Sequence, residues 1–337
     1  MSVTDADRQS RVASWWRPLE NGKVRCELCP FTCELGEGKT GICRGKKNIG
    51  GSLYAVNYAR TTSINLDPIE KKPLYHFYPG SSILSIGPNG CNLACNFCQN
   101  YHISQKEFPT RYLPPKDAVT LAKAAVSVGI AYTYAEPLIW FEYVLDTSHA
   151  VREAGLKNVM VTNGVINQGP LEEILPVIDA MNIDVKSMDP SFYKRTCKGP
   201  LEAVLETVKA SVKKTHVEIT NLVIPGLNDS DEMFEKLTDF IAELNPFIPL
   251  HFSRYHPDYK QNAPSTPFPT LLRGIEIASK KLKFVYIGNV PQEKYSQTNC
   301  TNCGKVIVTR SGFMTLELHV RHGKCGYCGA DAHVISD

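Results

Sequence analysis

The stretch SILSIGPNGCNLACNFCQN, residues 82–100, decides both the fold and the chemistry of this chain. It begins with an apolar run that has the length and composition of a buried strand, residues 82–87. A turn rich in glycine, proline and asparagine follows, and then Cys91, Cys95 and Cys98 with the spacing C-x3-C-x2-C. Thiolates at such short intervals converge on one soft metal centre, so we expect a metal site directly after a strand.

Three cysteines on one loop are one fewer than a closed metal site needs. Structural zinc takes four ligands, and an ordinary [4Fe–4S] cluster takes four cysteines. A [4Fe–4S] cluster held by Cys91, Cys95 and Cys98 would leave one iron open to a substrate ligand. A zinc ion completed by His102 or by a distant residue is the alternative, and the spacing favours the open cluster over it.

The segment after this loop alternates strand-like and helical patterns. Apolar residues recur at helical spacing between the strand-like runs, as Val204, Val208 and Val212 do. This alternation predicts an α/β fold of six or seven units, in which a parallel sheet carries helical crossovers and functional residues follow the strands. The predicted strands are residues 82–87, 129–133, 158–162, 181–185, 216–224, 249–252 and 284–287.

The central loop, with Phe97 directly before its last cysteine, resembles the signature of the radical S-adenosylmethionine (SAM) superfamily. The resemblance implies a partial (β/α)6 barrel and a [4Fe–4S] cluster whose open iron binds SAM, with Phe97 among the cofactor-binding residues. It also implies an external one-electron donor, cleavage of SAM to a 5′-deoxyadenosyl radical, and hydrogen abstraction from a substrate. We therefore expect a radical SAM core at residues 81–296.

Polar residues after the next three predicted strands resemble elements of activase-like radical SAM enzymes. TYAEP resembles their TYNEP element, which implies that Glu136 contacts the SAM amino group. DVKSMD resembles the DLKxxD element of pyruvate formate-lyase activating enzymes, which implies that Asp184 and Lys186 bind the ribose hydroxyls and the carboxylate of SAM. Asn163, in VTNG, completes the expected cofactor-binding set.

Two further cysteine groups flank this core. Near the C-terminus, two C-x2-C pairs lie 21 residues apart, and the residues between them predict two strands around the Ser311-Gly312 turn. This pattern is typical of a zinc ribbon, so we expect a zinc-ribbon-like module at residues 297–337, with an iron or rubredoxin-like centre as the alternative. The four ligands would be Cys300, Cys303, Cys325 and Cys328.

The N-terminal group belongs to a predicted cysteine-rich segment, residues 1–80. Its four cysteines suit either zinc or an iron–sulfur cluster, with zinc slightly preferred and a disulfide or unligated set as the third alternative. They are Cys26, Cys29, Cys33 and Cys43. The remaining cysteine, Cys197, could be a redox partner, a hydrogen-atom donor or a small buried apolar residue.

The chain as a whole is similar to the radical SAM enzyme of the AmmeMemoRadiSam system, a relative of the pyruvate formate-lyase activating enzymes. The name of that system implies companion proteins, so a protein substrate or partner is expected. The matching stretches include RCELCPFTC at 25–33, the central loop, HFSRYHPDY at 251–259, YIGNV at 286–290 and the terminal C-x2-C pairs.

Composition excludes several other classes. The 337 residues are 43% hydrophobic, which suffices for a core, and a net charge of +3 is too balanced for a dedicated nucleic-acid binder. No apolar stretch approaches the roughly 18 residues of a membrane span, and the polar N-terminus lacks a signal peptide's apolar region. We expect a cytoplasmic protein, in which the 12 cysteines bind metals instead of forming disulfides.

Three functions fit these patterns. The first is a radical SAM enzyme that abstracts hydrogen from a macromolecule, such as a partner protein, or from a small molecule. The second is a glycyl-radical activase acting on a backbone glycine of a partner enzyme, although the extra cysteines flank the core instead of following the central loop. The third is a non-catalytic metal-binding scaffold, which the intact three-cysteine loop disfavours.

Overall fold

The computed structural model describes residues 10–290 and 293–336. The polar start of the chain, on which the expectation about a signal peptide rests, lies outside these ranges for residues 1–9. Among the described residues, no helix combines the length and the apolar character needed to cross a membrane.

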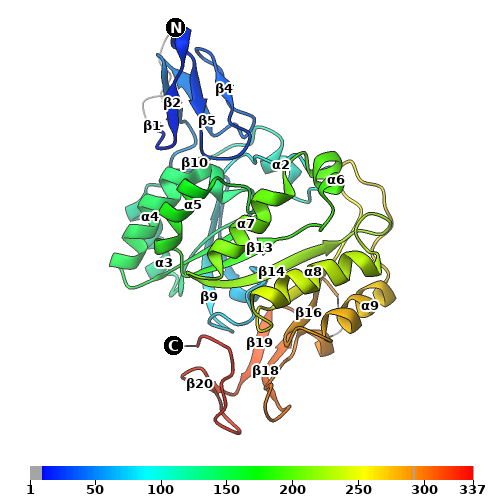
Figure 1. The fold of residues 1–337 in the computed structure, drawn as a ribbon. Coiled ribbons are helices and arrows are strands. Elements are labelled where there is room, and N and C mark those ends of the chain that lie inside the picture. The colour runs from blue at the N-terminus through cyan, green and yellow to red at the C-terminus, as the bar shows by residue number, and fades with distance from the viewer. Residues whose placement is uncertain (1–9, 291–292, 337) are drawn as a thin grey trace.

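One large sheet organises the chain (Figure 1). Its strands are β8 (Ser63–Pro68), β9 (Ser82–Gly87), β11 (Gly129–Tyr132), β12 (Lys157–Thr162), β13 (Ala180–Asp184), β14 (His216–Val223), β15 (Leu250–Arg254) and β16 (Val285–Gly288). They lie in the order β16-β15-β14-β13-β12-β11-β9-β8. The strands from β9 to β16 pair in parallel, and β8 pairs antiparallel with β9. Because this order is linear, the sheet is open and does not close into a complete barrel.

All seven strands predicted from the sequence are present, with ends that differ by at most two residues. The edge strand β8 was not predicted because its apolar residues are few and only one of its six residues is buried. Because β8 lies within the predicted segment 1–80, the large sheet begins before residue 81. The division into residues 1–80, 81–296 and 297–337 stays a prediction.

Helices connect the parallel strands. The crossovers are α3 (Pro115–Ala124), α4 (Phe141–Glu153), α5 (Gln168–Ile174), α7 (Leu201–Ser211), α8 (Asp231–Leu244) and α9 (Phe268–Ala278). Shorter turns are α2 (Tyr101–Ser104), α6 (Pro190–Phe192) and the π-helical η5 (Tyr193–Cys197). Local sequence explains their starts, since α3 and α9 carry proline in the first turn and Ser230 caps α8. Val204 and Val208, at helical spacing, are fully buried.

The inner face of the sheet is packed with a cluster of apolar side chains at one end only. Ile83, Ala131, Val159 and Ala180, from four adjacent strands, form a small buried cluster with Ile69, Leu74 and Phe77. Ile83, Val159 and Ala180 lie in the first half of their strands, and Ala131 pairs with Val159, so this cluster closes the amino-terminal end of the sheet's inner face. The carboxyl-terminal end of the same face is left for the polar residues that follow the strands.

The N-terminal module packs against α4 and α5 (Figure 1). Its strands are β1 (Arg11–Val12), β2 (Trp16–Pro18), β3 (Val24–Cys26), β4 (Glu34–Leu35), β5 (Lys46–Ile49), β6 (Ser52–Ala55), β7 (Arg60–Thr61) and the later β10 (Arg111–Tyr112). A buried ion pair between Lys46 and Glu142 joins it to α4, and the Ser14 amide also donates to Glu142. The Trp15 indole donates to Glu173 at 2.8 Å, so the module has anchors on both helices.

The C-terminal module lies at the opposite end (Figure 1). Its strands are β17 (Thr298–Asn299), β18 (Val306–Ser311), β19 (Met314–Leu318), β20 (Val320–Arg321) and β21 (Lys324–Cys325). β18 and β19 form the predicted hairpin around Ser311-Gly312. Arg310 is fully buried at its junction with the sheet, where it donates to the Tyr75 carbonyl at 2.6 Å and to Thr298 at 2.8 Å.

A buried polar cluster completes this junction. The carboxylate of Glu218, on β14, accepts hydrogen bonds from the Tyr75 and His76 amides and contacts the rings of His216 and His251. His76 Nδ1 lies 2.7 Å from the His333 carbonyl, and Nε2 lies 2.6 Å from the Tyr286 hydroxyl. This pattern fits a neutral imidazole that donates through Nδ1 and accepts at Nε2.

The buried His76 gives the junction a pH dependence. Burial lowers the pKa of His76 to about 3, so the folded protein binds a proton on this ring less readily than the unfolded chain does. Its contribution to stability is present above pH ~6.5 and is lost as the pH falls toward 3, at up to about 1.4 kcal/mol per pH unit. We expect the thermal midpoint of wild type to fall more steeply between pH 7.5 and 5.5 than that of His76→Gln.

The control is His149→Gln, because His149 is exposed on α4. Its thermal midpoint should fall with pH as steeply as that of wild type. Parallel slopes for wild type and His76→Gln would contradict the assignment of this pH dependence to His76.

Candidate active site

A cavity of about 590 Å³ lies at the carboxyl ends of the parallel strands, in the size range of small-molecule sites. The loops that follow β9, β11, β12 and β13 contribute to its lining, as strand-end geometry requires. It brings together every residue that the sequence assigned to the core site. These are Cys91, Cys95, Phe97, Cys98, Glu136, Asn163, Asp184 and Lys186.

The cysteine loop is held in place by backbone contacts with the turn before α7. The amide of Ala94 donates to the Cys197 carbonyl at 2.9 Å, and the amide of Asn96 donates to the Thr196 carbonyl at 3.1 Å. The sulfur of Cys91 accepts the Leu93 amide at 3.3 Å. The loop therefore points its three thiols into the cavity without a regular element of its own.

Burial raises the pKa of the Cys91 and Cys98 thiols, so both are neutral when no cation is near. Metal binding requires thiolates and would displace these protons. Cys98 lies 3.1 Å from the Ser104 hydroxyl, which can donate to the sulfur once it is a thiolate. Such donors stabilise sulfur ligands of iron–sulfur clusters.

Cys197 lies behind the site. Its side chain is fully buried and hydrogen-bonded to Cys95, but it is not among the residues that line the cavity. The cavity is therefore lined by three cysteines, the number that leaves one position of a cluster open. A role for Cys197 as a direct hydrogen-atom donor to a substrate does not fit this placement.

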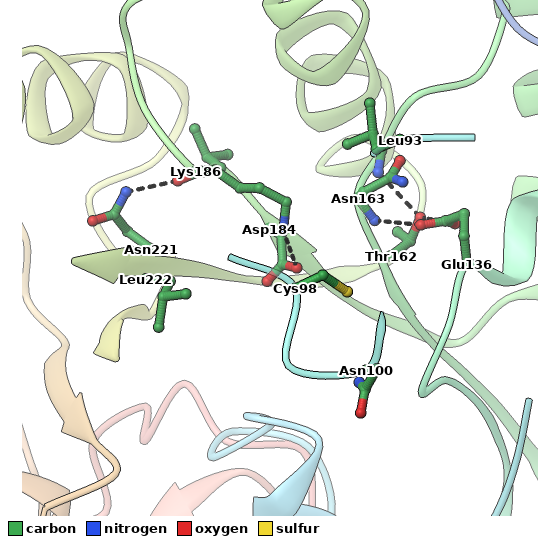
Figure 2. A network of polar contacts seen from close by, with 12 residues as sticks. Leu93, Cys98, Asn100, Glu136, Thr162, Asn163, Asp184, Lys186, Asn221 and Leu222 are labelled. Atoms are coloured by element: carbon green, nitrogen blue, oxygen red, sulfur yellow. Dashed lines mark hydrogen bonds and ion pairs between the residues drawn. The ribbon is translucent and has the colours of Figure 1, made fainter. Parts of the chain in front are cut away.

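Glu136 ties the ends of two strands together (Figure 2). One carboxylate oxygen accepts the Leu138 amide at 3.0 Å and the Thr162 hydroxyl at 2.6 Å, and the other accepts the Asn163 amide at 2.8 Å. Burial raises the pKa of Glu136 to about 7 despite these donors. The carboxylate lines the cavity and is rigidly positioned, and its contact with the SAM amino group stays a prediction.

Asn163 links the hydrogen bonds of Glu136 to the cysteine loop. Its side-chain amide donates to the side-chain oxygen of Asn92, Oδ1, at 3.0 Å and lies 3.5 Å from the Cys91 sulfur. Asn92 in turn donates to the Val165 carbonyl at 2.7 Å. The sulfur of Cys91 is thus placed through Asn163 by the same carboxylate that joins β11 to β12.

Asp184 and Lys186 form an ion pair of 2.7 Å at the end of β13 (Figure 2). The Lys186 amide donates to the Tyr193 hydroxyl at 2.9 Å, and Asn228 donates to the Lys186 carbonyl, so the backbone here is fixed. Burial acts to lower the pKa of Lys186, but Asp184 and the nearby Cys95 hold it well above its usual value. The ammonium therefore stays charged and can bind a carboxylate.

Asp189, the last residue of the DVKSMD motif, has a different role. It caps α6 and accepts the amides of Ser191 and Phe192 at 2.8 and 3.2 Å. On β15, Ser253 lines the cavity, whereas His251, two residues earlier, faces Glu218.

Sequence reasoning missed several cavity residues. Tyr134 and Asn100 lie at its rim, where Asn100 donates to the Tyr134 carbonyl at 2.6 Å. Phe313 reaches the cavity from the tip of the β18–β19 hairpin. Nothing in the sequence signals this approach, because Phe313 is more than 200 residues from the central loop and looks like an ordinary hairpin residue.

The C-terminal cysteines can hold a single metal ion. The Cys300 and Cys328 sulfurs are 3.7 Å apart, the Cys303 and Cys325 sulfurs are 3.8 Å apart, and all four lie within 4.8 Å of one another. The edge of a tetrahedron with Zn–S bonds of about 2.3 Å is roughly 3.8 Å. Hydrogen bonds from Ala330 and Asn302 lower the pKa of Cys328 to about 6, which favours its thiolate form.

Comparisons with known proteins agree with this geometry. Residues 85–241 match the family described as the radical SAM superfamily. The uncharacterized protein MJ0808 of Methanocaldococcus jannaschii is 44% identical over 334 residues, covering 96% of this chain and 99% of that protein. The pyruvate formate-lyase 1-activating enzyme of Escherichia coli K12 is 25% identical over 176 residues, covering 50% and 71%.

A third relative is the (2S)-3-sulfopropanediol dehydratase activating enzyme of Klebsiella oxytoca, 27% identical over 114 residues, covering 34% of this chain and 36% of that enzyme. Among solved structures, a radical SAM methyltransferase from Sphaerobacter thermophilus matches the fold with a TM-score of 0.50 at 15% identity, covering 68% of this chain and 71% of that one.

An open parallel α/β sheet with three thiols and a ligand cavity at its strand ends defines an enzyme of radical chemistry. The chain belongs to the radical SAM superfamily. Within it, the chain resembles the pyruvate formate-lyase activating enzymes, as the strand-end motifs predicted. The family implies a [4Fe–4S] cluster and SAM as cofactors.

The position of Asp184 predicts a test of ligand binding. Asp184→Asn removes a carboxylate that can accept hydrogen bonds from two hydroxyl groups. Hydrogen bonds to charged groups contribute about 1.5–3 kcal/mol. We expect the SAM affinity, measured by equilibrium binding to the cluster-loaded protein, to fall roughly 10- to 100-fold. The iron content should not change, because Asp184 is not a cluster ligand.

The matched control is Asp239→Ala, which removes an exposed carboxylate on α8 that pairs only with Lys281. It should bind SAM as wild type does. Wild-type affinity in Asp184→Asn would remove this aspartate from the SAM site.

Proposed function

We propose that this protein cleaves SAM reductively and uses the resulting 5′-deoxyadenosyl radical to abstract a hydrogen atom from a partner protein. The single observation that carries the proposal is the convergence of three thiols, one ion pair and one buried carboxylate in a cavity at the strand ends. No other cavity that we describe combines a cysteine triad with charged groups able to bind an amino acid and a ribose.

The residues present fit a site-differentiated [4Fe–4S] cluster. Three thiols line the cavity, the fourth cysteine near them lies behind it, and a serine hydroxyl and a backbone amide are directed at the sulfurs. When bound and reduced, such a cluster supplies the electron that cleaves SAM, with a low-potential external donor as its source. Cys91, Cys95 and Cys98 would hold it.

The surrounding residues then bind and orient SAM. Lys186 supplies a charged donor for the SAM carboxylate, and Asp184 supplies acceptors for the ribose hydroxyls. Glu136 is placed for the amino group, whose positive charge would favour the ionised carboxylate. Phe97 and Asn163 complete the walls next to the cysteines.

A protein substrate is supported by the C-terminal module. Phe313 lines the cavity at the tip of the hairpin, and the adjoining edge strand β19 exposes apolar side chains at every second position. These are Met314, Leu316 and Leu318. A partner chain bound along this edge would lead directly to the cavity. Companion proteins of the AmmeMemoRadiSam type, in a cytoplasmic setting, are the first partners to test.

The four C-terminal cysteines are proposed to hold structural zinc. The distances between their sulfurs support a single tetrahedral ion, and the hairpin that bears Phe313 lies between the two cysteine pairs. The metal would thus keep the partner-binding edge in a fixed shape.

A second candidate is a glycyl-radical activase, which would abstract hydrogen from a backbone glycine. The relatives whose names describe activating enzymes favour it. The placement of the extra cysteines outside the segment after the central loop weighs against it.

The proposed reaction predicts a labelled product. Cluster-loaded protein, dithionite and SAM are incubated with a fully deuterated companion protein, and 5′-deoxyadenosine is analysed by mass spectrometry. We expect 5′-deoxyadenosine that carries deuterium. Cys95→Ala, the control, should form none because its cluster lacks one ligand. A companion protein labelled only at glycine separates the candidates, since deuterium transfer from it would favour the activase.

Leu316→Glu tests the docking edge. A charge on β19 should lower the partner-dependent yield at least tenfold, whereas 5′-deoxyadenosine formed without partner should stay at the wild-type level. Glu235→Leu, which changes an exposed residue of α8, is a charge-altering control. Deuterium transfer at the wild-type rate in Leu316→Glu would place the partner elsewhere.

Zinc content tests the ribbon. Cys303→Ser should remove about one zinc per chain and lower the thermal midpoint, because a tetrahedral site with three thiolates binds zinc far more weakly. SAM cleavage without partner should persist, since the module is remote from the cysteine triad in sequence and contributes only Phe313 to the cavity. Unchanged zinc would refute this site.

A further inference from the structure

The four N-terminal cysteines converge on one cavity at the junction of the N-terminal module and the α/β core, which is the large sheet with its crossover helices. Cys26, Cys29, Cys33 and Cys43 all line it, although the last two are ten residues apart in the sequence. Its other walls are mostly apolar, and several come from the α/β core. The core residues that line it are Asn92, Leu138, Ile139 and Val165.

The thiols in this cavity are arranged as ligands. Cys26 and Cys43 are buried, and backbone amides two residues further along donate to the sulfurs of Cys26, Cys29 and Cys43. The same relation holds for Cys91 in the active site, whose sulfur accepts the Leu93 amide. Backbone donors at this position stabilise metal-bound thiolates and tune iron–sulfur clusters. The reduced cysteines form no disulfide among the described residues.

The spacing of the sulfurs distinguishes two kinds of metal site in this protein. Four thiolates that share one zinc ion lie roughly 3.8 Å apart, as the C-terminal sulfurs do. The C-terminal set is the one group, in residues 10–290 and 293–336, whose ligand atoms lie mutually within 4.8 Å. Neither the N-terminal sulfurs nor the active-site triad meets this distance, and both sets are therefore spread more widely than one ion requires.

A wider spread suits a cubane cluster. Each thiolate of a [4Fe–4S] cluster binds a different iron, so the sulfurs stand further apart than around a single ion. The active-site triad provides an internal reference, because the superfamily implies such a cluster there. The N-terminal set likewise lacks three ligand atoms that lie mutually within 4.8 Å, and it has one more cysteine than the triad. Zinc, which the sequence slightly preferred, is the poorer fit.

This cavity adjoins the active-site loop directly. Asn92, which follows the ligand Cys91, hydrogen-bonds to Cys29 and lines the N-terminal cavity. On the other side of Cys91, Gly90 packs so closely on the Cys43 carbonyl that a Cβ would lie 2.2 Å from its oxygen. The two cysteine loops are thus in contact through residues on either side of Cys91.

We propose that Cys26, Cys29, Cys33 and Cys43 bind a second [4Fe–4S] cluster adjacent to the SAM cluster. With four protein ligands it has no open iron, so it binds neither SAM nor substrate. The inference concerns a separate set of ligands and stands whether or not the protein cleaves SAM.

The first test counts metals in the wild-type chain. The protein is produced anaerobically with iron and zinc both in the medium, and iron, sulfide and zinc are measured without reconstitution. We expect about eight irons, about eight sulfides and one zinc per chain. About four irons with two zincs would overturn the proposal in favour of N-terminal zinc, and about four irons with one zinc would overturn it in favour of an unligated set.

The second test separates the two clusters. Cys91→Ala/Cys95→Ala/Cys98→Ala should retain about four irons. Its reduced electron paramagnetic resonance spectrum should not respond to SAM. Cys26→Ser/Cys43→Ser should lose about four irons while keeping a signal that SAM changes. A triple variant without iron would overturn the proposal. Cys303→Ser is the matched control, because it should lower zinc and leave the iron count at the wild-type value.

Discussion

The carboxylate of Glu136 is the constraint on which the site depends. By accepting the Thr162 hydroxyl and the Asn163 amide, it fixes the end of β12 against the loop that follows β11. Asn163 then positions Asn92 and the sulfur of Cys91. A single buried group therefore sets the relative positions of two strand ends and one cluster ligand. Its raised pKa reflects the free energy spent in burying a carboxylate for this purpose.

The sequence sufficed to predict most of the sheet and the site. Parallel buried strands are continuous apolar runs, so β9 to β16 could be placed within two residues, and strand-end motifs follow such runs directly. Phe313, the contact of Cys197 with Cys95 and the contact of Gly90 with Cys43 could not be predicted, because each depends on packing between distant segments. The edge strand β8 was missed because its pattern is mixed.

The three cysteine groups show how spacing in the sequence differs from spacing in the fold. Each has short C-x2-C or C-x3-C intervals, which indicate a metal but not its kind. The hairpin of the C-terminal module brings its four sulfurs within 4.8 Å of one another, whereas neither of the other two groups, as the structure describes them, has three ligand atoms that close together. Local backbone geometry, more than the number of cysteines, decides between a single ion and a cluster.

The docking of Arg310 has a consequence for biosynthesis. The guanidinium that donates to the Tyr75 carbonyl, and the His333 carbonyl that accepts from His76, both come from the C-terminal module, which is translated after the large sheet. Domains generally fold from the N-terminus as synthesis proceeds. The packing at this junction therefore stays incomplete until the C-terminal module has been synthesised, and both cysteine loops are synthesised well before it. A nascent chain of this protein thus contains both of its predicted ligand loops before its tertiary structure is complete.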